Sequence, residues 1–151
     1  MMKKREAIVS YLEYQGIAEL PGADRKLVEE AVVAASGAYA PYSNFMVGAA
    51  ILLDDGTIVR GANVENAAFP SGSCAEKKAL SYTVANYRNN KSVAIAIAAL
   101  TEGKLTAEPV PPCGNCRQML IEEEQRLGKP IKVILAGQSG IIVLENCQLL
   151  M

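Results

Sequence analysis

The sequence contains no histidine and no tryptophan, and only 5% of its 151 residues are aromatic. The absence of histidine excludes serine–histidine and cysteine–histidine catalysis, which leaves a carboxylate as the natural group to move protons. A strong charge of either sign is also missing, since the formal net charge is −1 and the pI is about 5.6. A nucleic-acid binder usually carries a basic stripe. We therefore expect a small-molecule partner and no nucleic acid.

Long apolar runs are missing as well, so no membrane span is expected. The basic N-terminus continues with Glu6, Ser10 and Glu13 instead of the apolar stretch of a secretion signal. We therefore predict a cytoplasmic protein with no membrane partner. In a reducing compartment, its four cysteines favour metal binding or catalysis over disulfides. The length favours a single domain over residues 1–151.

The pattern of apolar residues predicts an α/β chain. Asp24 is a candidate N-cap, Asp54-Asp55-Gly56 is a hairpin turn, and Gly128 is a candidate C-cap. The expected helices cover residues 4–14, 25–38, 76–88 and 114–128, and the expected strands cover residues 46–53, 57–64, 92–100, 131–137 and 140–147. This order predicts helices on both faces of a mixed sheet.

Three of the four cysteines fall where predicted helices begin. Cys74 precedes one helix, and Cys113 and Cys116 open another in the sequence P-C-G-N-C. The positive end of a helix stabilises thiolate, which is the form that binds zinc. Three ligands suit a catalytic zinc, which keeps one position open for water. In the alternative, Cys147 completes a closed four-cysteine structural site, although it stands outside any paired spacing.

Glu76 is the candidate general acid and base. It lies two residues after Cys74, in the first turn of the same predicted helix, where it can approach zinc-bound water without being a ligand. Taken alone, a glutamate in this turn would more often serve only the helix dipole. Beside a zinc cysteine the catalytic role is favoured. The order C-A-E and then P-C-G-N-C matches the signature of zinc deaminases.

Two further motifs extend this match. They are YAPYSNFMVGAA at residues 39–50 and GANVENAAF at residues 61–69. With them, the chain resembles the cytidine deaminase family, in its small three-cysteine class, from about residue 39 to residue 135. The resemblance implies a three-layer α/β/α sandwich around a mixed sheet of about five strands. It also implies one Zn²⁺ per subunit and a homotetramer with active sites near subunit interfaces.

The resemblance also implies which residues bind a nucleoside. Asn63 and Glu65 would hydrogen-bond the ribose hydroxyls, Phe45 would pack against the pyrimidine, and the backbone around Ala75 would read the base edge. The simpler alternatives are that Asn63 is a turn residue and Phe45 a core residue. The implied reaction is hydrolysis of cytidine or 2′-deoxycytidine to the uridine product and ammonia, a step of pyrimidine salvage. Two alternatives stay open, namely deamination of another aminonucleoside and a non-catalytic zinc-stabilised binding domain.

The chain departs from the family pattern near the metal ligands. The family commonly reads C-A-E-R-T-A, in which the arginine offsets the charge of the thiolates, whereas this chain reads C-A-E-K-K-A. Lys77 supplies charge but not the planar fork of arginine, so Lys77 and Arg117 are both candidates for charge compensation. Lys78 fits better as part of a solvated helix face. Phe69 stands where the family often has tyrosine, and LENCQLLM lacks the proline and the aromatic residue of the usual C-terminal tail.

Overall fold

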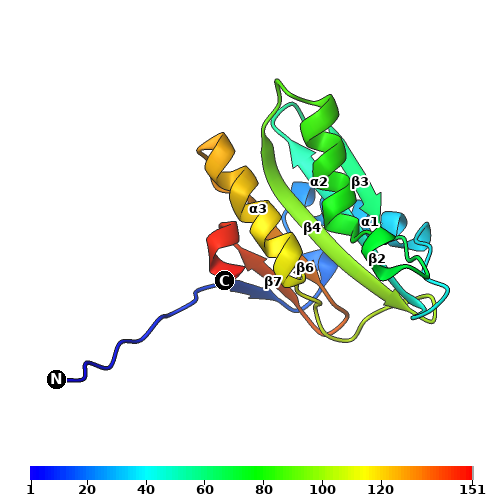
Figure 1. The fold of residues 1–151 in the computed structure, drawn as a ribbon. Coiled ribbons are helices and arrows are strands. Elements are labelled where there is room, and N and C mark those ends of the chain that lie inside the picture. Colours follow the sequence, from blue (N-terminus) through cyan, green and yellow to red (C-terminus); the bar gives the residue numbers. More distant parts are fainter. Residues whose placement is uncertain (151) are drawn as a thin grey trace.

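The computed structural model, which describes residues 1–150, has one seven-stranded mixed sheet with helices on both faces (Figure 1). The elements are β1 (Leu12–Tyr14), η1 (Ile17–Glu19), α1 (Gly22–Ser36), β2 (Phe45–Leu53), β3 (Ile58–Ala62), η2 (Phe69–Ser71), α2 (Ala75–Asn86), β4 (Ser92–Thr101), β5 (Lys104–Leu105), α3 (Gly114–Leu127), β6 (Lys132–Ala136), β7 (Ile141–Leu144) and η3 (Cys147–Leu150). Helix α1 packs on one face, and α2 and α3 pack on the other. The predicted three-layer α/β/α fold is confirmed.

The strand order brings two helix N-termini to one edge of the sheet. The order is β1-β7-β6-β4-β2-β3, with β5 paired to β4. Strands β3 and β4 both run antiparallel to β2, so they point in the same direction. Helix α2 follows β3, and α3 follows β4 and leads to β6, which runs parallel to β4. Both helices therefore begin at the edge where β3 and β4 end.

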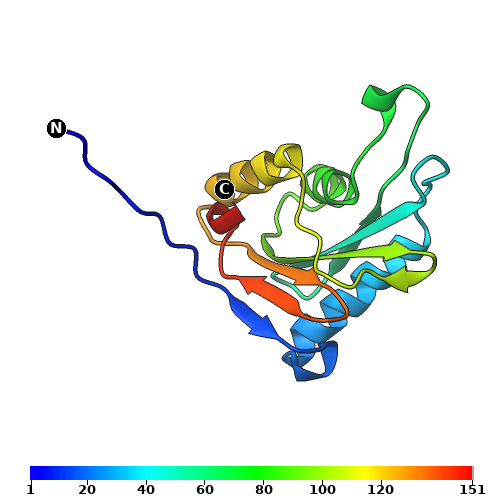
Figure 2. The ribbon, with the colours of Figure 1, turned by 90° about the horizontal axis from the view of Figure 1, so that it is seen from below.

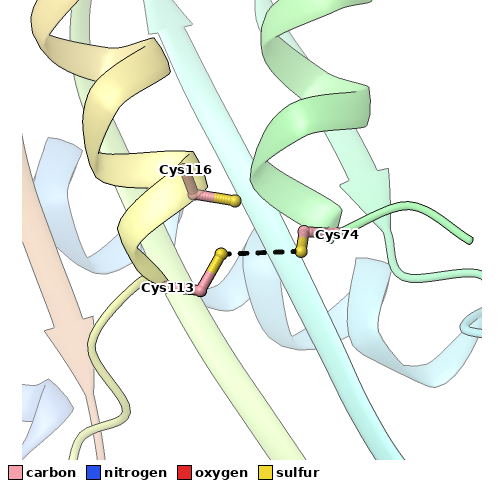
Figure 3. Close-up of side chains that lie close together, drawn as sticks. All are labelled: Cys74, Cys113 and Cys116. Atoms are coloured by element: carbon pink, nitrogen blue, oxygen red, sulfur yellow. Dashed lines mark hydrogen bonds between the residues drawn. The ribbon is translucent and has the colours of Figure 1, made fainter. Parts of the chain in front are cut away.

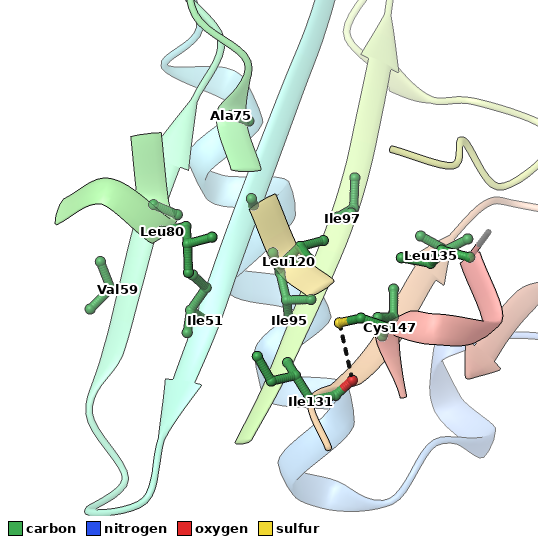
Figure 4. Close-up of a cluster of buried hydrophobic side chains, with 14 of the residues drawn as sticks. Ile51, Val59, Ala75, Leu80, Ile95, Ile97, Leu120, Ile131, Leu135 and Cys147 are labelled. Carbon is green, nitrogen blue, oxygen red and sulfur yellow. Dashed lines mark hydrogen bonds between the residues drawn. The ribbon is translucent and has the colours of Figure 1, made fainter. Parts of the chain in front are cut away.

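Alternating side chains along β4 explain how one strand serves two cores. Ile95 and Ile97 belong to the core beneath α2 and α3, whereas Ala94, Ala96 and Ala98 belong to the core beneath α1. This alternation follows from the two-residue period of a strand. The bulky residues of the first core are shown in Figure 4. A strand buried on both faces reads as a continuous apolar run, which is why this strand was predictable.

Two glycines allow the helices to approach the sheet closely. A Cβ atom at Gly48 would lie 2.0 Å from the carbonyl oxygen of Ala31 in α1. A Cβ atom at Gly61 would lie 2.4 Å from the carbonyl oxygen of Ala75 at the start of α2. Any larger residue at Gly61 would push the beginning of α2 away from β3. This glycine therefore helps to fix the N-terminus of the helix that follows Cys74.

Several sequence predictions about the first third and the sheet were wrong. Residues 4–14 do not form a helix: residues 1–11 carry no helix or strand, and Leu12–Tyr14 pairs with β7 at the sheet edge. In Figure 2 this N-terminal segment extends away from the body of the fold. Asp24 is not an N-cap, because α1 is capped by Pro21 and Asp24 pairs with Lys132 at 2.7 Å. The sheet has seven strands instead of about five because β1 and β5 were not expected.

Within residues 1–150, no helix is long and apolar enough to cross a membrane.

Candidate metal centre

Three cysteine thiols meet where α2 and α3 begin (Figure 3). Cys74 is the N-cap of α2, Cys113 is the N-cap of α3, and Cys116 lies in the first turn of α3. The three sulfur atoms all lie within 4.8 Å of one another, and the sulfurs of Cys74 and Cys113 are 3.9 Å apart. Because β3 and β4 end at the same edge of the sheet, the fold brings together three cysteines that lie up to 42 positions apart in the sequence.

The donor set and its spacing fit a zinc ion. With Zn–S bonds of about 2.3 Å, tetrahedral coordination places two sulfurs about 3.8 Å apart. The observed 3.9 Å between the sulfurs of Cys74 and Cys113 matches that value. Cys147 is not part of this group, because its buried thiol points to the carbonyl oxygen of Ile131 at 3.5 Å (Figure 4). The geometry is that of a three-thiol site, which leaves a tetrahedral metal one open position.

The polypeptide alone does not hold the three thiols as thiolates. Burial raises the pKa of both Cys116 and Cys74. At Cys113, burial also opposes ionisation, but hydrogen bonds from the backbone N–H groups of Cys116 and Asn115 help to lower its pKa overall. A bound Zn²⁺ supplies the missing charge, because a coordinating thiol loses its proton outright. Metal binding at this site therefore releases protons and weakens as the pH falls.

Glu76 lies beside this cluster as a buried carboxylate. Its side chain is only 5% exposed, and burial raises its pKa, while its own backbone N–H and the Cys116 thiol lower the pKa less strongly. Its carboxylate oxygens do not belong to the group of atoms that surrounds the metal position. The arrangement thus provides a carboxylate that is close to the thiols, shielded from water and suited to holding a proton.

A short backbone ladder connects the three thiols to the motif at residues 61–69. Val64 and Ser73 exchange two hydrogen bonds of 3.0 and 2.9 Å between their backbone groups. On the other side, Tyr39 donates to the carbonyl of Asn63, and Glu65 donates to the carbonyl of Tyr39. Because Ser73 directly precedes Cys74, this ladder sets residues 63–65 at a fixed distance from the metal centre.

The predicted substrate residues Phe45, Asn63 and Glu65 lie around this ladder. The Asn63 amide accepts a hydrogen bond from the Val47 N–H at 2.7 Å and donates to the Phe45 carbonyl at 3.0 Å. Asn63 therefore holds the start of β2, where Phe45 is half-buried. These bonds leave one amide hydrogen and one oxygen lone pair of Asn63 available.

The Glu65 carboxylate is held by the loop before β2. Its Oε1 atom accepts hydrogen bonds from the backbone N–H groups of Tyr42 and Ser43 at 3.1 and 3.2 Å. Asn44 follows in a left-handed conformation with φ of 57°, which asparagine adopts more readily than most residues. This loop was not predicted as a support for Glu65. The P-Y-S-N stretch, which is typical of a turn, was the available signal.

The two candidates for charge compensation, Lys77 and Arg117, lie in different surroundings. The side chains of Lys77 and Lys78 are exposed and make no hydrogen bond or ion pair within residues 1–150, although the backbone N–H of Lys78 donates to the carbonyl of Cys74 at 3.1 Å. Arg117 donates from Nε to the carbonyl of Pro112 at 2.8 Å and from Nη1 to the carbonyl of Leu150 at 2.6 Å. Ala75, predicted as a backbone contact to the base, is fully buried in the first turn of α2. The carbonyl contacts of Arg117 link distant parts of the chain and left no signal in the sequence.

Comparison with known proteins identifies the family. Residues 21–127 match the model of the cytidine and deoxycytidylate deaminase zinc-binding region. Cytidine deaminase from Halalkalibacterium halodurans is 49% identical over 96 residues, which cover 64% of this chain and 68% of the relative. Cytidine deaminase from Mycobacterium tuberculosis is 39% identical over 104 residues, which cover 68% of this chain and 74% of the relative.

Comparison with solved structures leads to the same family. The crystal structure of cytidine deaminase from Burkholderia pseudomallei matches with a TM-score of 0.68 and 43% identity, over 82% of this chain and 93% of that chain. The matched region of the family model contains all three thiols, Glu76 and the ladder that leads to Glu65. The chain therefore belongs to the cytidine and deoxycytidylate deaminase family.

Proposed function

We propose that this protein catalyses the zinc-dependent hydrolysis of cytidine and 2′-deoxycytidine to uridine and 2′-deoxyuridine, with release of ammonia. The observation that carries the proposal is the position of the buried Glu76 carboxylate beside three thiols that meet at two helix N-termini. Membership of the deaminase family supports the same reaction. The protein would then act in pyrimidine salvage.

In this proposal, the three thiols of the metal centre hold one zinc ion. When bound, zinc acts as a Lewis acid and lowers the pKa of a coordinated water towards neutrality. The helix N-termini beneath Cys74 and Cys113 favour the thiolate form of the ligands. Burial of Cys116 excludes water from the inner side of the site.

Glu76 carries out both proton transfers of the reaction. It takes one proton from the attacking water and delivers it to N3 of the pyrimidine, while the water oxygen forms a bond to C4. It then takes the second proton from the new C4 hydroxyl group and transfers it to the exocyclic amino group. The bond between C4 and this amino nitrogen breaks, ammonia leaves, and the C4 carbonyl of the uracil forms. A carboxyl group with a raised pKa suits this cycle, because it accepts and returns a proton at little cost near neutral pH.

Glu65 and Asn63 would hold the sugar. Only Oε1 of Glu65 is engaged by Tyr42 and Ser43, so Oε2 is available to accept a hydrogen bond from a ribose hydroxyl. Asn63 retains one amide hydrogen for the same purpose. Phe45, at the start of β2, would pack against the pyrimidine, and the backbone at Ala75 would meet the base edge. The ladder between residues 64 and 73 would keep sugar and base in register with Glu76.

The direct test is an absorbance and ammonia-release assay on zinc-loaded protein with a panel of cytidine, 2′-deoxycytidine, cytosine, adenosine and guanosine. We expect turnover of the first two. Turnover of another aminonucleoside alone would contradict the substrate assignment. Tight zinc binding with no turnover of any compound would favour the non-catalytic zinc-stabilised domain instead.

The proposal includes a homotetramer with active sites near subunit interfaces. An apolar groove of about 800 Å³ lies between α2 and α3 and is lined in part by Leu80, Val84 and Met119. Phe69 is 91% exposed on η2, which stands out from the body of the fold (Figure 2). Burial of such surfaces in an assembly would stabilise it. Light scattering should give four times the 16.1 kDa of one chain, and a monomer would contradict this part of the proposal.

The cytoplasm is the proposed location. All four cysteines are free thiols, and the sulfurs of Cys74 and Cys113 approach to 3.9 Å. A reducing compartment keeps such neighbouring thiols available for the metal.

A further inference from the structure

Arg117 connects the metal centre to the C-terminal turn. It directly follows Cys116, and its half-buried guanidinium donates to two backbone carbonyls, those of Pro112 and Leu150, at 2.8 and 2.6 Å. The two carbonyls lie 38 positions apart in the sequence. The planar fork of arginine presents several N–H groups in fixed directions, so one side chain can hold two segments in a fixed relation.

The first of these segments sets the position of a metal ligand. Pro112 is fully buried and directly precedes Cys113, the N-cap of α3. Cys113 is the most exposed of the three thiols, since Cys74 is half-buried and Cys116 is buried. Burial and packing therefore restrain Cys113 least. The hydrogen bond that Arg117 donates to the Pro112 carbonyl restrains the backbone directly before Cys113. The exposed side chain of Cys113 does not provide such a restraint.

The second segment is itself anchored. Glu124 lies seven positions after Arg117, and therefore two turns further along the same face of α3. Its Oε2 atom accepts a hydrogen bond from the N–H of Cys147, the first residue of η3, at 2.8 Å. Leu150, at the other end of η3, is only 7% exposed and belongs to the hydrophobic core. Arg117 thus connects the Pro112–Cys113 bend to a turn that is fixed at both ends.

We propose that Arg117 is a positioning residue that holds Cys113 in place for zinc by tying Pro112 to the C-terminal turn. Its role is then to supply geometry more than positive charge, which separates it from the charge compensation expected from the sequence. The inference rests on the proposed function, because it concerns the same metal centre. Residues that orient metal ligands typically change metal affinity or activity by about 10- to 100-fold when they are replaced.

The test compares Arg117→Lys, which keeps the charge and loses the fork, with the matched control Arg126→Lys. Arg126 lies on the same helix and makes a two-point contact with Glu123 at 2.8 and 2.6 Å. Zinc-loaded proteins are mixed with a chromophoric chelator, and the rate of zinc release is measured beside kcat and KM. We expect Arg117→Lys to release zinc at least about 10-fold faster than wild type. Its KM for cytidine should stay unchanged, and Arg126→Lys should behave like wild type.

A second control distinguishes the effect of the Leu150 carbonyl from the effect of the Leu150 side chain. Leu150→Ala keeps the carbonyl and loses core packing, so its melting temperature should fall while zinc release stays slow. If Arg117→Lys does not fold, a chain that ends at Leu149 removes the acceptor and is compared with Leu150→Ala in the same assay. Zinc release from Arg117→Lys, or from the shortened chain, that is no faster than from the controls would overturn the inference. Wild-type protein that binds no zinc would instead contradict the proposed function.

Discussion

A buried glutamate meets a buried cysteine at two places in this fold, and the two places differ in what the carboxylate is bonded to. Glu76 lies beside Cys116 at the beginning of α3, and Glu124 lies beside Cys147 near its end. The two glutamates are 5% and 6% exposed, and burial raises the pKa of both thiols. Oε2 of Glu124 accepts two backbone hydrogen bonds of 2.8 Å, from Ile131 and Cys147.

At Glu76, by contrast, the only backbone N–H within residues 1–150 that acts on the carboxylate is its own. Burial alone therefore does not distinguish a catalytic carboxylate from a structural one. The distinction comes from the partners. The Glu124 carboxylate satisfies backbone groups of two other residues that would otherwise be buried without a hydrogen bond, whereas the partners of the Glu76 carboxylate, in the part of the chain that the structure describes, are its own backbone N–H and the Cys116 thiol. The same difference separates the cysteines, because Cys147 faces a carbonyl and Cys116 faces two other thiols.

The largest effect is expected from comparing the two kinds of cysteine. Cys113→Ser should lose zinc and nearly all activity, because two thiolates remain where zinc needs at least three protein ligands. Cys147→Ser should keep its zinc, because the Cys147 thiol contacts the Ile131 carbonyl and lies outside the metal centre. The zinc content per chain of the two variants, determined by atomic absorption, distinguishes a three-thiol site from a four-cysteine site. Equal loss of zinc in both variants would indicate a closed four-cysteine site.

Glu65 is an intermediate case, since one of its oxygens is bonded and the other is available. Glu65→Gln should lower kcat/KM for cytidine by about 10- to 100-fold, which corresponds to the loss of a hydrogen bond to a charged group. The effect should appear in steady-state assays with cytidine. It should be nearly absent with 2′,3′-dideoxycytidine, which lacks the hydroxyls. An equal loss with both substrates would assign Glu65 a purely structural role.

Glu124→Gln should change stability and leave catalysis intact. The substitution weakens two charge-assisted hydrogen bonds and should lower the free energy of unfolding by about 1–3 kcal/mol. Urea denaturation of the zinc-loaded protein measures this change, and kcat on cytidine should stay within about twofold of wild type. A large loss of kcat at full zinc occupancy would remove the distinction between the two glutamates.

The smallest expected effect concerns pH. Burial tends to raise the pKa of Glu65, but hydrogen bonds from Ser43 and Tyr42 lower it overall, below its usual value of 4.5. The ionised carboxylate therefore stabilises the fold above pH 4.5, and this contribution is lost as the pH falls through the lowered folded-state pKa. The melting temperatures of wild type and Glu65→Gln should differ near neutral pH and converge in acid. A difference that does not depend on pH would contradict this.

The metal centre was largely predictable from the sequence because its parts are local. Each pair of neighbouring residues, Cys74 with Glu76 and Cys113 with Cys116, stands at a helix start that apolar periodicity places within a few residues. What the sequence could not supply was the direction of the strands. The three thiols meet because β3 and β4 are both antiparallel to β2, so that α2 and α3 begin at the same edge.

Three differences between the sequence predictions and the structure share one physical cause, which is dependence on distant partners. An isolated helix as short as the one predicted over residues 4–14 is marginal in water, and Leu12–Tyr14 instead pairs with a strand about 130 positions away. Asp24 suits an N-cap by residue type, yet its partner is Lys132. Arg117 likewise contacts Leu150, a carbonyl that no local pattern could indicate. Long-range pairs of this kind override local preferences.

The comparison of Glu76 with Glu124 is tested most directly by replacing Glu76 with glutamine in protein whose zinc content has been measured. We expect Glu76→Gln to fold, to hold one zinc per chain, and to lose at least about 10²- to 10⁴-fold in kcat on cytidine, as is typical when a general acid and base is removed. A Glu76→Gln protein with full zinc and near-normal kcat would contradict the account.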